Sequence, residues 1–149
     1  MQDRVFPAPI RQTTLNVMTK ASAPLILIVD DAADICSMLE LRLQASGYRT
    51  LTAKSAQEAL AATQRERPDL IIMDVYMPQQ DGFNVARLIR EQDGLHEVPV
   101  IAMSAYGVFG IDSQLRRDAE LAGFIGYMSK PLDFQQLEKH LESALHNIE

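Results

Sequence analysis

The sequence predicts an α/β fold in which helices cover both faces of a five-stranded parallel sheet. Short, almost uniformly apolar segments alternate along the chain with longer segments in which apolar residues recur at helical spacing. Continuously apolar, β-branched segments are typical of strands that are buried on both faces, as in parallel sheets. Strands that alternate with helices pair in parallel through right-handed crossovers, so this order indicates a doubly wound sheet.

Five segments have the composition of strands. The first, "LILIVD", is apolar and rich in β-branched residues up to its final aspartate, whereas "YRTLTA" alternates like a less buried strand. The third, "LIIMD", also ends on an aspartate. The predicted strands are residues 25–30, 48–53, 70–74, 98–104 and 124–129.

Five helices are predicted between and after these strands. Gly47 is a natural residue just past a helix end, Ser55 and Glu58 have the spacing of a capping box, and Asp133 precedes the last helix as its cap. The predicted helical segments are residues 33–47, 55–68, 82–92, 113–123 and 133–148. Residues 1–23 fit no periodic pattern, so we expect an irregular N-terminal extension before a single folded domain at 24–149.

Charge and composition exclude several classes of protein. A net charge of -6 disfavours binding to a phosphate backbone, which argues against direct DNA binding. No apolar segment approaches the ~20 residues that cross a bilayer. The single cysteine, Cys36, has no partner for an internal disulfide and fits a small core residue in a reducing compartment. We therefore expect a cytoplasmic protein.

The ends of the predicted strands carry polar residues. Asp30 and Asp31 follow the first strand, Asp74 ends the third, Ser104 ends the fourth, and Lys130 follows the fifth. Each has an ordinary alternative as a helix cap, a strand-end hydroxyl or a solvated lysine. Chemistry in open α/β sheets gathers at the carboxyl ends of strands, where all five groups would converge. Three carboxylates there would repel one another unless a hard cation such as Mg²⁺ joined them.

Four motifs in this order, "ILIVDD", "IIMDVYMPQQDG", "IAMSA" and "GYMSKP", closely resemble the receiver domain of bacterial two-component response regulators. The resemblance covers about residues 24 to 147 and is to the single-domain, chemotaxis-regulator-like members. It implies a flavodoxin-like sheet with strand order 2-1-3-4-5. It also implies that Asp74 accepts a phosphoryl group from a phosphohistidine on a sensor histidine kinase or a histidine phosphotransfer protein.

The resemblance further assigns a metal site. It implies that Asp31 and Asp74 ligate Mg²⁺ directly, that the main-chain carbonyl of Tyr76 is a third ligand, and that Asp30 acts through water. The chain would then be a phosphoacceptor that switches the binding of a downstream protein target. It would not turn over a small substrate.

Residues near the end of the sheet would respond to phosphorylation. The resemblance implies that Lys130 pairs with a phosphoryl oxygen, that Ser104 hydrogen-bonds another, and that Tyr127 is the aromatic switch residue. A cis peptide bond before Pro131 would fix the direction of the lysine. The loop at 105–112 is longer than usual for the family. It is either a harmless insertion or a segment that packs on the fourth helix and alters the switch surface.

Two other functions share this type of fold. A phosphohydrolase of the haloacid-dehalogenase type needs a second acid two residues after its aspartate, where this chain has Tyr76. A flavin-binding module needs a loop rich in hydroxyls and glycine after the first strand, where "DDAADI" is acidic. Phosphatase turnover, flavin absorbance and stoichiometric labelling by acetyl phosphate distinguish the three alternatives.

Overall fold

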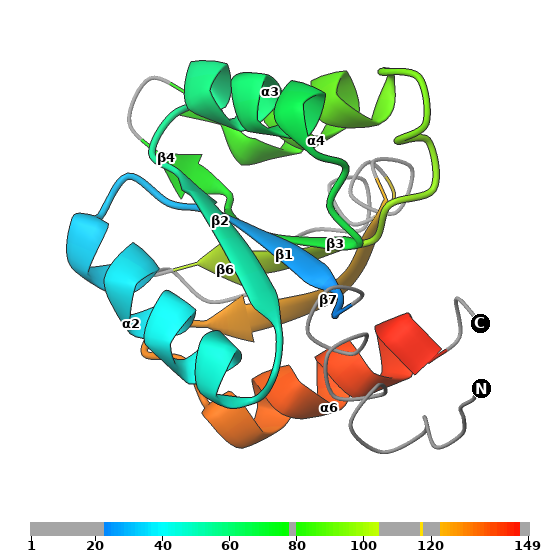
Figure 1. Ribbon diagram of the computed structural model, residues 1–149. Coiled ribbons are helices and arrows are strands. Elements are labelled where there is room, and N and C mark those ends of the chain that lie inside the picture. The colour runs from blue at the N-terminus through cyan, green and yellow to red at the C-terminus, as the bar shows by residue number, and fades with distance from the viewer. Residues whose placement is uncertain (1–22, 78–79, 105–116, 118–122, 147–149) are drawn as a thin grey trace, which may run out of the picture.

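A five-stranded parallel sheet forms the centre of the molecule (Figure 1). The computed structural model describes residues 23–77, 80–104, 117 and 123–146. The order of the strands is β2-β1-β3-β6-β7, which is 2-1-3-4-5 when these five are counted along the chain, so the predicted order is confirmed. Their bounds are β1 Leu25–Val29, β2 Arg49–Ala53, β3 Leu70–Asp74, β6 Val100–Ser104 and β7 Phe124–Ser129.

Helices cover both faces of the sheet, and two apolar layers fill the space between. Figure 1 shows α3 and α4 on one face and α2 and α6 on the other. In β3, Ile71 and Met73 belong to the layer under α3 and α4, whereas Leu70 and Ile72 belong to the layer under α2 and α6. This alternation makes the strand apolar up to Asp74, because each face needs an apolar side chain. The helices are α2 Ala33–Ala45, α3 Ala56–Arg65, α4 Gly82–Arg90 and α6 Phe134–His146.

The predicted helix-end signals are present, although the return bond of the capping box goes to Lys54 and not to the cap residue Ser55. The Ser55 hydroxyl accepts a hydrogen bond from the N–H of Glu58 at 3.1 Å, and the Glu58 carboxylate accepts from the N–H of Lys54 at 2.8 Å. The Asp133 carboxylate accepts from the N–H of Gln135 at 3.0 Å. Gly47 follows α2 with φ +97°, a conformation that glycine adopts without steric cost.

One pair of strands was not predicted. Strands β4 (Tyr76–Met77) and β5 (Gln80–Asp81) form an antiparallel pair directly after β3, in a segment that the sequence pattern does not mark as extended. The predicted helices and strands otherwise end within a few residues of the observed bounds. Predictions for the extension at 1–23, the loop at 105–112 and the helix at 113–123 fall wholly or largely outside the described residues. Among the described helices, none has the length and apolar character to cross a membrane.

Candidate functional site

The sheet brings the polar strand ends together at one edge. Asp30 directly follows β1, Asp74 is the last residue of β3, Ser104 is the last residue of β6, and Lys130 directly follows β7. Because β1, β3, β6 and β7 are successive neighbours and all run parallel, their carboxyl ends lie side by side. Asp31 follows Asp30 in the sequence and lies at the same edge of the sheet. The structure therefore assembles the five residues that the sequence placed at this edge.

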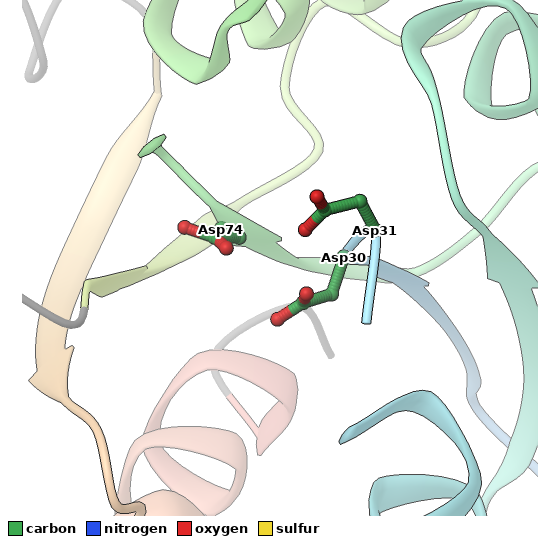
Figure 2. A group of neighbouring side chains, drawn as sticks. All are labelled: Asp30, Asp31 and Asp74. Atoms are coloured by element: carbon green, nitrogen blue, oxygen red, sulfur yellow. The ribbon is translucent and has the colours of Figure 1, made fainter. Parts of the chain in front are cut away.

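Three carboxylates converge at this edge (Figure 2). Asp30, Asp31 and Asp74 each offer an oxygen within 4.8 Å of the others. Asp30 is fully buried, Asp74 is nearly so, and Asp31 is exposed, so the cluster opens to solvent on the Asp31 side. Oxygen donors at this spacing suit a hard divalent cation, which can retain water on its open side. The residues present therefore fit a metal site.

Lys130 bridges the two buried carboxylates. Its Nζ donates to Oδ2 of Asp30 at 2.7 Å and to Oδ2 of Asp74 at 3.0 Å. Burial lowers the pKa of the Lys130 ammonium, but hydrogen bonds and charge from both carboxylates outweigh it, so the pKa is raised overall. The Lys130–Pro131 peptide bond is cis, the geometry that the resemblance implies. The ammonium thus remains charged between the two acids.

Asp30 accepts hydrogen bonds from residues at the start of α2. Its Oδ1 accepts from the N–H of Ala32 at 2.9 Å, and its main-chain carbonyl accepts from the Cys36 thiol at 3.3 Å. Burial raises the pKa of the Asp30 carboxyl, against the opposing effect of Lys130. Burial also raises the pKa of the Cys36 thiol to about 11, which matches the expectation of a core cysteine. No pattern in the sequence indicates that this thiol contacts the acidic residue.

Asp74 is bound on both of its oxygens. Oδ1 accepts from the N–H of Tyr76 at 2.9 Å, whereas Oδ2 accepts from Lys130. The Tyr76 side chain is 45% exposed, and its main chain pairs with Asp81 in the β4–β5 hairpin. The resemblance implies that the main-chain carbonyl of Tyr76 is a metal ligand. In the structure, the main-chain N–H of the same residue contacts the Asp74 carboxylate.

The two predicted switch residues lie on adjacent strands. Ser104 is fully buried, and its carbonyl accepts from the N–H of Lys130 at 2.9 Å. Tyr127 is half-buried on β7 and pairs in register with Ala102, two residues before Ser104. The Ser104 hydroxyl and the Tyr127 ring therefore belong to two paired strands, both of which end near the acidic cluster.

Gly82 is a site residue that the sequence analysis missed. A Cβ at this position would lie 2.5 Å from the Cα of Val75 and 2.8 Å from the carbonyl oxygen of Asp74. The Gly82 N–H also donates to the Val75 carbonyl at 3.3 Å. The hairpin therefore returns onto the backbone of Asp74 itself, and only glycine leaves room. The "DG" pair before a helix marks a turn in the sequence but does not reveal what the turn touches.

A comparison with protein families agrees with this geometry. The sequence profile of the response regulator receiver domain matches residues 26–142. The chain belongs to this family. The receiver domain thus includes every residue of the acidic cluster, together with Lys130.

Similar proteins support the assignment to the receiver-domain family. The chain is 31% identical over 120 residues to the polar-differentiation response regulator DivK of Brucella anthropi, a match that covers 80% of this chain and 94% of that protein. It is 36% identical over 124 residues to the probable transcriptional regulator ycf27 of Cyanophora paradoxa. That match covers 83% of this chain but 49% of the relative, so this chain spans about half of its length.

Solved receiver structures share the fold. The chemotaxis protein CheY4 of Vibrio cholerae superposes with a TM-score of 0.75 at 30% identity, over 83% of this chain and 99% of that one. The receiver domain of a sensor histidine kinase from Pseudomonas aeruginosa gives a TM-score of 0.71 at 30% identity, over 84% and 99% of the two chains. That structure has a magnesium ion coordinated in its active-site cleft.

Proposed function

We propose that this receiver domain takes a phosphoryl group on Asp74 from a phosphohistidine of a sensor kinase or phosphotransfer protein, and that the modified domain binds a downstream protein target. The observation that carries the proposal is the position of Asp74. It is a nearly buried carboxylate at a strand end, beside two other acids and in contact with Lys130. A carboxylate so placed has charged groups ready to stabilise an incoming phosphoryl group.

The chemistry needs few protein groups. A carboxylate oxygen of Asp74 forms a bond to phosphorus while the bond between phosphorus and the histidine nitrogen breaks, and the leaving imidazole keeps the electron pair. We assign Lys130 to a phosphoryl oxygen, because its Nζ already donates to Oδ2 of Asp74 at 3.0 Å. We assign the Ser104 hydroxyl to another phosphoryl oxygen, because Ser104 ends the adjacent strand.

We assign Mg²⁺ to the acidic cluster, with Asp31, Asp74 and the Tyr76 carbonyl as ligands and Asp30 acting through water. When bound, the ion would neutralise charge on the phosphoryl oxygens. The spacing of the three carboxylates supports this assignment, as does the magnesium ion of the related Pseudomonas aeruginosa receiver domain. The protein's own part is to hold these oxygens in place before the donor arrives.

Incubation with acetyl phosphate tests the proposal. In the presence of Mg²⁺, intact-mass spectrometry should show a single added phosphoryl group, and peptide mapping after borohydride reduction should locate it at Asp74. The same incubation with EDTA should leave the mass unchanged. Modification at another aspartate, or equal labelling without a divalent ion, would contradict the assignment.

Replacing Asp31 should weaken metal binding. Because Asp31 supplies the exposed carboxylate of the cluster, we expect Asp31→Ala to raise the Kd for Mg²⁺ at least about tenfold, or roughly 1.4 kcal/mol. Isothermal titration calorimetry measures this directly. Asp34→Ala is the matched control, because Asp34 is an exposed acid in the first turn of α2 outside the cluster. Equal affinities in wild type and Asp31→Ala would remove Asp31 from the site.

Replacing Gly82 should also weaken metal binding, although Gly82 has no side chain to offer. In Gly82→Ala the new methyl group must displace the hairpin from Val75 and from the Asp74 carbonyl. We expect the Kd for Mg²⁺ to rise about tenfold at a temperature where the variant is folded. Gly94→Ala is the control: its Cβ meets nothing within 4 Å, and the strain of alanine at φ +81° lowers stability at a position outside the acidic cluster. A lower melting temperature with an unchanged Kd would show that Gly82 serves stability alone.

A further inference from the structure

Three aromatic rings form a continuous path through the side of the sheet that α4 covers. Phe83 contacts Phe124 edge-on, with ring centroids 5.1 Å apart and an angle of 63° between the planes. Phe124 in turn stacks on Tyr127, with centroids 6.3 Å apart and planes within 13°. Phe124 is 5% exposed, and the other two rings pack against the same core layer. We call Phe83, Phe124 and Tyr127 the ring path.

The two ends of the ring path lie next to the two segments that hold Asp74. Phe83 is in the first turn of α4, next to Gly82, where the hairpin after Asp74 ends. Tyr127 lies on β7, three residues before Lys130. The hairpin holds Oδ1 of Asp74 through the N–H of Tyr76, and β7 leads to the lysine that holds Oδ2. The path therefore runs from the residue after Gly82, where the hairpin ends, to the strand that leads to Lys130.

We propose that Phe83 and Phe124 are positioning residues that couple the hairpin after Asp74 to Tyr127 through ring contacts. The inference rests on the proposed function, since it concerns how phosphorylation of Asp74 is transmitted. A phosphoryl group converts one Asp74 oxygen into the bridging oxygen of an acyl phosphate, so at least one of the bonds from Tyr76 and Lys130 must change. A change in the bond from Tyr76 or in the bond from Lys130 then acts on the same three rings.

Packing makes this route effective. Phe124 is enclosed in the core, where close-packed side chains transmit displacement because there is little free volume to absorb it. Its stacking on Tyr127 restricts the tyrosine ring, since offset aromatic pairs prefer a narrow range of geometries. Ser104 and Tyr127, on paired strands, provide a separate connection through β6. The ring path adds a route on the α4 side that does not pass through the serine.

A double-mutant cycle on the binding of beryllofluoride, a mimic of the phosphoryl group, tests the coupling. Calorimetry with Mg²⁺ in excess measures the Kd of the wild type, Phe124→Leu, Tyr127→Leu and the double variant. We expect Phe124→Leu to change the Kd about threefold or more, and we expect this change to disappear when Tyr127 is already leucine. Phe134→Leu is the control, because Phe134 packs in the opposite core layer beneath Arg42.

The outcomes separate the inference from the function on which it rests. A wild type that does not bind beryllofluoride with Mg²⁺ would overturn the proposed function, and the coupling with it. Wild-type binding with an unchanged Kd in Phe124→Leu would overturn the coupling alone, as would an equal effect in the Tyr127→Leu background. If Phe124→Leu does not fold, Phe83→Leu at the half-buried end of the path is measured in the same cycle and judged by the same outcomes.

Discussion

Asp74→Asn is expected to abolish incorporation of phosphate from acetyl phosphate while the fold persists. The amide of asparagine has nearly the shape of the carboxylate but is not a nucleophile for phosphoryl transfer. We do not expect Asp30 or Asp31 to replace it, because Asp30 is fully buried against Lys130 and Asp31 is assigned to the metal. Lys130 and the Tyr76 N–H would still surround position 74. Intact-mass spectrometry after incubation with Mg²⁺ measures the loss.

Asp93→Asn is the matched control for this experiment. Asp93 is an acid that follows α4 and has no part in the acidic cluster, so its variant should be labelled like the wild type. Circular dichroism and a thermal melt establish that Asp74→Asn is folded. Full labelling of the folded Asp74→Asn protein at any other side chain would show that the acceptor is wrongly assigned.

The architecture was predictable because it depends on local patterns. A strand buried on both faces needs an unbroken apolar run, so segments such as "LIIMD" indicate both the strand and the polar residue at its end. Once five such strands alternate with helices, their carboxyl ends must share an edge. The shared position of Asp30, Asp74, Ser104 and Lys130 could therefore be predicted from the sequence alone.

The parts that were missed depend on contacts between distant segments. The strands β4 and β5 have two residues each, too short for any periodicity to mark them. The close approach of Gly82 to Asp74 and the stacking of Phe124 on Tyr127 follow from how the hairpin and β7 meet the rest of the core.

Lys130→Met is expected to lower the free energy of unfolding by about 3 kcal/mol in the absence of divalent ions. The substitution keeps an unbranched side chain but leaves Asp30 and Asp74 as neighbouring buried carboxylates without their cation, and breaking a buried ion pair from one side has a cost of this order. Urea unfolding in EDTA measures the difference. Lys139→Met, an exposed lysine on α6, should change stability little.

Added Mg²⁺ should restore much of the stability that Lys130→Met loses. A cation that binds the folded state alone stabilises it in proportion to its affinity, and three carboxylates without an ammonium attract a divalent ion more strongly than the wild-type cluster does. The unfolding midpoint of Lys130→Met should therefore rise more with Mg²⁺ than that of the wild type or of Lys139→Met. Equal gains in all three proteins would mean that the lysine and the metal do not act on the same carboxylates, and would separate the metal site from the Asp30–Lys130–Asp74 cluster.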